Sequence, residues 1–179
     1  MKVERTAIAE VVLLEPKVFP DERGMVFESY NRRVFMEATG VAPEFVQDNR
    51  SISRKNVLRG LHYQVVKPQG KLIQVLRGEI FDVAVDLRRA SPTFGKWVGA
   101  RLSEANRRMI WIPPGFAHGL LALTEVDVLY KMTELWAPEH DRTIAWDDPA
   151  IGIQWPVEQP ILSAKDKAGK RLQQAELFP

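Results

Sequence analysis

Short runs of apolar or alternating residues recur along the chain and are separated by turn signals. The runs predict strands at residues 11–14, 25–30, 57–64, 72–76, 80–87, 97–102, 108–112, 119–123 and 126–133. The intervening segments 20–24, 77–79, 91–95 and 113–115 contain the Gly, Pro, Asp and Ser residues that favour turns. Many short strands with few helices predict an all-β sandwich or jelly-roll barrel, which would enclose a cleft between its sheets.

Helix signals occur at two places only. Asn31 is a good N-cap for a helix over residues 31–38, and Gly40 follows its end. A second short helix is expected after Ser163. The chain shows no internal repeat, low-complexity tract or linker, so we expect a single domain over residues 1–179 with one or two short peripheral helices.

Composition narrows the classes of function. The 179 residues are 45% hydrophobic and carry a formal net charge of only +2, without a basic run, so nucleic-acid binding is not expected. The N-terminus lacks the apolar core of a signal peptide, and no apolar run approaches the roughly 20 residues that span a bilayer. The chain has no cysteine, which excludes disulfides and thiolate ligands. We therefore expect a cytoplasmic protein that does not enter a membrane.

The segment 57–64 combines an apolar strand pattern with a guanidinium and an imidazole. Strand alternation puts His62 on one face and Arg59 on the other, so both cannot point into a cleft from a regular strand. Gly60 lies between them, and a glycine inside a strand often marks a bulge. We predict an irregularity at Gly60 that turns both side chains toward an anionic ligand.

Alternation also bears on the polar residues of later strands. Lys71 shares a face with Ile73, so its ammonium is expected in the cleft. Asp82 could compensate Lys71 if it pointed inward, but the pattern favours a solvated strand face for Asp82 and Asp86. Tyr130 by itself would be interpreted as core packing with its hydroxyl bonded at an edge.

Several motifs together resemble one family. They are FPDERG at 19–24, FESY at 27–30, FVQDN at 45–49, VLRGLH at 57–62, QGKL at 69–72, FDVAVD at 81–86, WIPPGFAHG at 111–119, LYK at 129–131 and LSAKD at 162–166. In this order they resemble the dTDP-4-dehydrorhamnose 3,5-epimerases, and the resemblance extends from about Thr6 to Asp166.

The resemblance implies a cupin-type double-stranded β-helix, or jelly roll, that forms a homodimer with strands shared across the interface. The apolar stretch 11–14 would offer an edge for such pairing. The implied reaction inverts C3 and C5 of dTDP-4-dehydro-6-deoxy-D-glucose to give dTDP-4-dehydro-L-rhamnose, with no metal and no other cofactor. In this scheme His62 is the base, Lys71 stabilises the enolate, and Tyr130 is the acid on the opposite face.

Further residues match family positions around the substrate. Asp166 would orient the ring of His62, although Ser163 and Asp166 also read as a helix-capping pattern. Bidentate guanidinium groups suit a diphosphate, which is the role implied for Arg23 and Arg59. The remaining substrate contacts implied by the resemblance are Phe19, which would stack on the thymine, and Glu28, Gln47, Asn49, His118 and Asp141.

Three features qualify this assignment. The motif around His118 resembles a cupin metal motif, but Gln64 stands where a second histidine near His62 would be needed, so His118 is expected to contact substrate or support His62. Leu135 and Trp136 stand where many relatives have tyrosines, and Asp141 replaces a longer glutamate. A 3-epimerase, a ketoisomerase of another deoxysugar, and a non-catalytic sugar-nucleotide-binding jelly roll remain alternatives.

Overall fold

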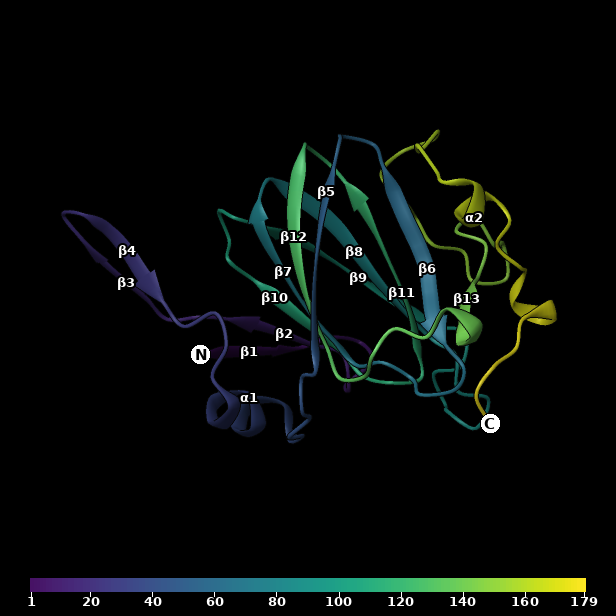
Figure 1. Ribbon diagram of the computed structural model, residues 1–179, viewed down its shortest axis with the longest axis horizontal. Helices are drawn as coiled ribbons and strands as arrows, with labels where there is room; N and C mark the ends of the chain where they lie inside the picture. The colour runs from purple at the N-terminus through teal and green to yellow at the C-terminus, as the bar shows by residue number, and fades with distance from the viewer.

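Two β-sheets and a separate hairpin make up most of the computed structural model, which describes residues 1–179 (Figure 1). The six-stranded sheet has the order β1-β2-β10-β7-β12-β5 and the five-stranded sheet the order β13-β6-β11-β8-β9. The strands of the first sheet are β1 (Lys2–Arg5), β2 (Val12–Glu15), β10 (Met109–Ile112), β7 (Lys71–Arg77), β12 (Val126–Met132) and β5 (Gln47–Ser53). Those of the second are β13 (Asp141–Thr143), β6 (Leu58–Gln64), β11 (Phe116–Ala122), β8 (Glu79–Asp86) and β9 (Trp97–Ser103). The predicted all-β fold is confirmed.

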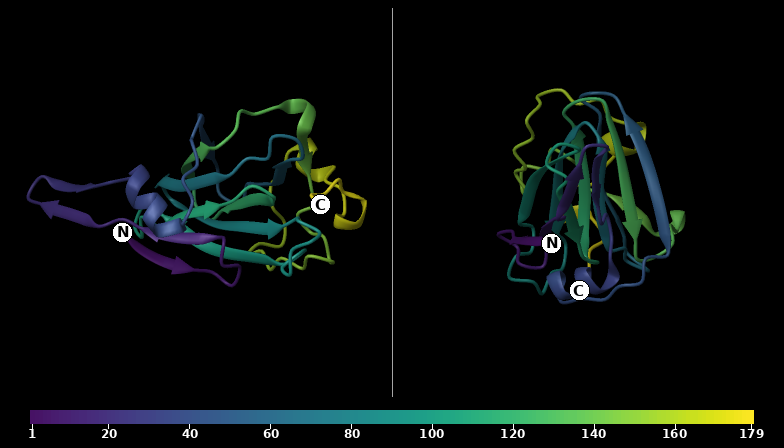
Figure 2. Two further views of the ribbon diagram at one scale, coloured as in Figure 1. Left: turned by 90° about the horizontal axis from the view of Figure 1, so that it is seen from below. Right: turned by 90° about the vertical axis from the view of Figure 1, so that its left-hand side faces the viewer.

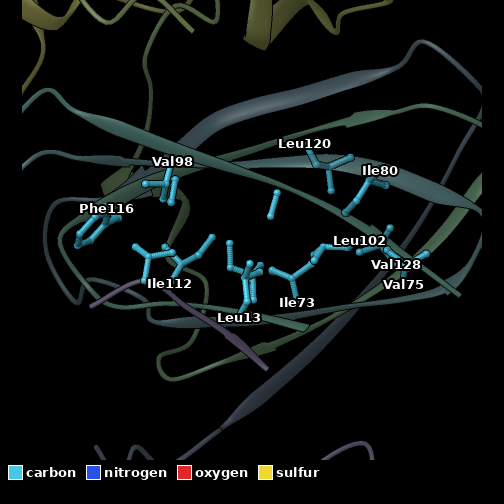
Figure 3. Close-up of a cluster of buried hydrophobic side chains, with 14 of the residues drawn as sticks. Leu13, Ile73, Val75, Ile80, Val98, Leu102, Ile112, Phe116, Leu120 and Val128 are labelled. Carbon is cyan, nitrogen blue, oxygen red and sulfur yellow. The ribbon is translucent and has the colours of Figure 1, made fainter. Parts of the chain in front are cut away.

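The two sheets pack face to face over an apolar core (Figure 3). Ile73 and Val128 enter this core from the six-stranded sheet, while Ile80 and Leu120 enter it from the five-stranded sheet. All four side chains are buried, and burial of each contributes roughly 1.5–3 kcal/mol to folding. This shared core fixes the spacing of the sheets and therefore the width of the cleft between them.

The helices lie at the periphery, as the sequence predicts. Helix α1 (Arg32–Thr39) begins at the N-cap Asn31, whose side chain accepts the Val34 amide, and ends at Gly40 in the left-handed conformation. It packs Phe35 edge-on against Trp111, with ring centroids 5.2 Å apart. The second helix, α2 (Ala164–Lys167), follows Ser163. Two single 3₁₀ turns, η1 (Pro138–His140) and η2 (Leu172–Gln174), complete the helical elements.

A hairpin of β3 (Val18–Asp21) and β4 (Gly24–Phe27) projects away from the sheets, at the left of Figure 1 and of the left-hand view in Figure 2. It carries large apolar side chains that are mostly exposed, since Val26 is 70% exposed and Phe19 and Met25 are each 54% exposed. The predicted turn at residues 20–24 is the tip of this hairpin. Such an exposed apolar arm is typical of a contact surface for another protein chain.

Two sequence predictions about the strands need correction. The stretch 11–14 is not a free edge, because β2 is bonded to β1 on one side and to β10 on the other. The pattern also missed strands β1, β3, β5 and β13. No helix in the structure has the length and apolar character needed to traverse a lipid bilayer.

Candidate active site

A cavity of about 220 Å³ opens between the two sheets. His62 on β6 and His118 on β11 line it from the five-stranded sheet, and Tyr130 on β12 lines it from the six-stranded sheet. The other lining residues are Asn49, Arg50, Ser51, Arg59, Leu120 and Met132. The cavity therefore brings together side chains that are far apart in the sequence and belong to opposite layers of the fold.

The predicted irregularity in β6 is present. His62 pairs with His118 and Arg59 pairs with Leu120, so two intervening residues on β6 face one on β11. Gly60 has a φ of +123°, and a Cβ at this position would lie 2.6 Å from the Gly119 Cα. The shift lets Arg59 and His62 both reach the cavity, which a regular strand would forbid.

His62 is held by a carboxylate at the start of α2. Its Nε2 lies 2.6 Å from Asp166 Oδ1, and Ser163 Oγ donates to Asp166 Oδ2 at 2.7 Å. The Asp166 amide in turn donates to Ser163 Oγ, so Asp166 both completes the helix cap and orients the imidazole. Burial raises the pKa of Asp166, but hydrogen bonds from His62 and Ser163 outweigh it and lower the pKa overall. An ionised Asp166 stabilises the imidazolium form of His62.

Tyr130 is positioned by the edge strand β5. Its hydroxyl lies 2.9 Å from Ser51 Oγ, and its ring meets the His118 ring edge-on with centroids 6.1 Å apart. Burial raises the pKa of Tyr130 to about 12, so the phenol carries its proton at neutral pH. Tyr130 therefore presents a protonated phenol to the cavity and is not only a packing residue.

Lys71 lies beside the cavity without lining it. Its side chain is buried, and Nζ donates to the backbone carbonyl oxygen of His62 at 3.3 Å. Burial lowers the pKa of Lys71 to about 8, against the opposing influence of Asp141 and Asp82. The ammonium form still predominates at pH 7, which leaves a fixed cation next to the histidine.

The prediction that Asp82 and Asp86 lie on a solvated strand face is wrong, because both residues are 0% exposed. Asp82 Oδ2 lies 2.9 Å from His118 Nε2, while Asp86 accepts the hydrogen bonds of Arg88. The opposite face of β8 is also covered, because Val83 packs against the C-terminal segment. Strand alternation could not reveal this second layer.

His118 is held in place by its contact with Asp82. It is buried, and burial lowers its pKa although Asp82 acts in the opposite direction. Its Nε2 is occupied by Asp82, so Nδ1 is the ring nitrogen that remains for contacts in the cavity that His118 lines. The structure contains no cluster of three or more His, Cys, Asp or Glu side chains placed to hold a metal ion.

Asp141 lies in a polar cluster with residues of α2, of β5 and of the loop that carries Trp136. Its Oδ2 accepts hydrogen bonds from Lys165 Nζ at 2.5 Å and Trp136 Nε1 at 3.2 Å. Gln47 Oε1 accepts the Trp136 amide at 2.9 Å, and Gln47 Nε2 donates to Asn49 Oδ1 at 2.8 Å. Of these residues only Asn49 lines the cavity directly, and through Gln47 it connects the cavity wall to Trp136.

Three of the predicted substrate contacts lie elsewhere. Phe19 and Arg23 belong to the projecting hairpin, and Glu28 follows it. The Arg23 side chain is 84% exposed and pairs only with Asp21, while Glu28 accepts a hydrogen bond from Asn31. None of the three lines the cavity of its own chain.

The sequence prediction missed Arg50 and Ser51, which also line the cavity. Both belong to β5, whose sequence QDNRSIS contains almost no apolar residue. For Ser51 the usable signal was the alternate placing of Gln47, Asn49, Ser51 and Ser53, a period-2 pattern made of polar side chains. Arg50 falls outside this pattern.

The fold and the site together define a class of protein. It is a jelly roll whose cavity holds an imidazole and a phenol on opposing walls, which is an arrangement suited to acid–base catalysis. A sequence profile of the family described as dTDP-4-dehydrorhamnose 3,5-epimerase matches residues 5–174. The chain belongs to this family, and the resemblance seen in its motifs is confirmed.

Individual relatives agree with this assignment. The chain is 58% identical to a dTDP-4-dehydrorhamnose 3,5-epimerase of Pseudomonas aeruginosa, with both chains covered over 100% of their length. It is 56% identical to the Salmonella typhimurium enzyme of the same name, over 99% of this chain and 98% of the relative. The crystal structure of a dTDP-6-deoxy-D-glucose-3,5-epimerase of Legionella pneumophila, in complex with dTDP-4-keto-L-rhamnose, superimposes with a TM-score of 0.96. That chain is 48% identical, and the match covers 99% of this chain and 97% of the other.

Proposed function

We propose that this protein is an isomerase that inverts C3 and C5 of dTDP-4-dehydro-6-deoxy-D-glucose and forms dTDP-4-dehydro-L-rhamnose. The observation that carries the proposal is that His62 and Tyr130 line one cavity from opposite sheets. Inversion needs a proton removed from one face of a carbon and another delivered to the opposite face, which this placement allows. The chemistry draws on the side chains of the protein alone, without a metal or another cofactor.

His62 acts as the base. A hydrogen next to the C4 ketone becomes acidic because its removal places charge on the carbonyl oxygen. His62 takes this proton, and Asp166, 2.6 Å from Nε2, stabilises the resulting imidazolium. The side chain of His62 is 32% exposed, so it can pass the proton to solvent before the next inversion.

Lys71 stabilises the enolate. Its ammonium lies next to the backbone of His62, and with a pKa of about 8 it is charged at neutral pH. A buried cation interacts strongly with a developing oxyanion because little water screens the two charges. His118, held by Asp82, supplies a further polar contact on the same wall.

Tyr130 then protonates the opposite face. Its phenol is buried and neutral, and the carbanion carbon takes its proton to complete the inversion. The same two proton transfers at the second carbon give the doubly inverted sugar. Trp136 stands near the cavity in place of a tyrosine, and an indole cannot act as a proton donor of this kind, so Tyr130 serves both carbons.

The nucleotide part of the substrate requires a second chain. Arg59 and Asn49 line the cavity, but Phe19, Arg23 and Glu28 lie on or beside a hairpin that projects away from it. We propose a homodimer in which this hairpin reaches the cavity of the partner subunit, so that Phe19 stacks on thymine and Arg23 binds the diphosphate. Gln47 and Asp141 hold the loop that carries Trp136 beside this site. Residues 1–179 act as one domain in each subunit, and the cytoplasm stays the predicted compartment.

Incubation with the 4-keto sugar nucleotide in deuterated water tests this function. We expect deuterium at both C3 and C5 of an L-configured product, detected by NMR. Deuterium at C3 alone would indicate a 3-epimerase, a displaced carbonyl would indicate a ketoisomerase, and no deuterium would indicate a binding protein. His62→Ala is the matched variant: it should lose exchange at both carbons while its calorimetric affinity for dTDP stays close to that of the wild type.

A further inference from the structure

Ser51 contacts the acid of the proposed reaction from the edge strand β5. We propose that Ser51 relays a proton from solvent to Tyr130 between the first and the second inversion. This inference rests on the proposed double epimerisation and goes beyond it, because neither the motifs nor the proposed mechanism gives Ser51 a role.

The contact between the two hydroxyls follows from the register of the strands. Ser51 pairs with Val128 and Tyr130 pairs with Asn49, so Ser51 and Tyr130 are diagonal neighbours on the inner face of the sheet. A diagonal pair is within reach of an aromatic side chain. The Tyr130 hydroxyl lies 2.9 Å from Ser51 Oγ, and the structure shows no other hydrogen-bond partner for this phenol.

Double inversion creates a need for such a relay. In the first inversion the O–H bond of Tyr130 breaks and a C–H bond forms on the sugar, which leaves a phenolate. At the same time His62 gains the proton removed from the other face. Before the second inversion His62 must lose this proton and Tyr130 must regain one. The two transfers cancel, so the cycle consumes no net proton.

The cavity itself is a poor route for the returning proton. While the sugar ring lies between His62 and Tyr130, it blocks the direct path from one to the other. Ser51 offers a path through the wall: its hydroxyl proton passes to the phenolate oxygen, and its oxygen takes a proton from water. Ser51 is only partly buried, and β5 is the edge of its sheet with no strand on its other side.

Charge near Ser51 assists this transfer. Arg59 Nε donates to Ser53 Oγ at 2.9 Å, and its Nη2 donates to the Ile52 carbonyl oxygen at 3.3 Å. The guanidinium is thereby fixed along β5, and its positive charge favours the anionic form of Tyr130. A phenolate formed in the first inversion is thus stabilised until the relay delivers its proton.

Single-turnover reactions with excess enzyme in deuterated water test the relay with Ser51→Ala. The first inversion uses the proton already on Tyr130, whereas the second depends on resupply. We expect the rate of the second inversion, relative to the first, to fall by about tenfold or more. This loss is smaller than the rate enhancement that a general acid or base usually supplies. Singly inverted, singly labelled sugar should accumulate and be visible by NMR. Ser51→Thr, which keeps a hydroxyl, should restore the wild-type ratio.

Ser53→Ala is the matched control, because it removes a neighbouring hydroxyl of β5 that bonds Arg59 and not Tyr130. It should weaken substrate binding without changing the ratio of the two rates. If Ser51→Ala folds with a wild-type melting temperature and keeps the wild-type ratio, the relay is wrong, even if both inversions slow equally. A wild-type enzyme that labels only one carbon, or none, would instead overturn the proposed function.

Discussion

At the scale of single residues, burial determines the protonation states on which acid–base catalysis depends. Tyr130 is buried and keeps its proton, with a pKa of about 12, and Lys71 is buried and holds its proton less firmly, with a pKa of about 8. His62 is more exposed and is oriented by an ionised Asp166. A neutral acid and a base with a carboxylate partner thus line one cavity, and a buried cation lies beside it.

The lowered pKa of Lys71 predicts how activity depends on pH. Above about pH 8 the ammonium loses its proton and can no longer stabilise an oxyanion, so kcat/KM should decline as pH rises through this value. Lys71→Arg retains a charge at every accessible pH. We expect this variant to be slower than the wild type but to lack the decline near pH 8. The same alkaline decline in Lys71→Arg would assign it to another group.

At the scale of elements, the irregularity in β6 is what brings Arg59 and His62 to one cavity. Gly60 makes it possible, since its φ is +123° and the Gly119 Cα would lie 2.6 Å from a Cβ there. Any side chain at this position would meet both a conformational penalty and a backbone clash. The site therefore depends on a residue that contacts no substrate in our proposal.

Gly60→Ala should lower the free energy of unfolding by about 3 kcal/mol or more, because strain and clash add together. Gly24 is the matched control: its φ is +135°, but nothing lies within 4 Å of a Cβ at that position. Gly24→Ala should therefore cost only about 1 kcal/mol. Urea denaturation of both variants measures the difference, and equal losses of stability would contradict the account of β6.

Several elements could be predicted from the sequence because their patterns are local. The Asn31 cap and Gly40 mark both ends of α1, and Gly60 marks the irregular strand. Strand β5 was missed because its inner face lines a polar cavity, so its alternating positions carry polar side chains. Asp82 was misjudged because the C-terminal segment, far away in the sequence, covers the other face of β8. Patterns of period two describe one strand and cannot report what packs against it.

At the scale of the whole molecule, the residues that the family resemblance assigns to one substrate site lie in two separate places, the cavity and the projecting hairpin. His62 and Tyr130 line the cavity, while Phe19 and Arg23 lie on an exposed arm (Figure 1). The exposed apolar residues of this arm, Met25 and Val26 among them, suit a protein interface. Exchange of the arm between two subunits would reunite the two groups in each site.

Mixed dimers test this exchange. His62→Ala inactivates the cavity of its own subunit, and Arg23→Ala inactivates the arm that its subunit contributes to the partner. A hybrid dimer of the two variants would therefore contain one site with an intact cavity and an intact arm. Random mixing of unfolded chains followed by refolding should restore about one quarter of wild-type activity. His62→Ala mixed with Tyr130→Phe is the control, since both changes affect the cavity and no hybrid has an intact site. If the first mixture is as inactive as the control, the arm does not act in the partner subunit.

The central claim is that a base and an acid act on opposite faces of one sugar ring. Tyr130→Phe in deuterated water tests it most directly, because this variant keeps the base and removes the acid. We predict that solvent deuterium still enters at C3 or C5, returned by His62 to the face from which the proton left, while the configuration is retained. Inversion at both carbons at the wild-type rate would contradict it.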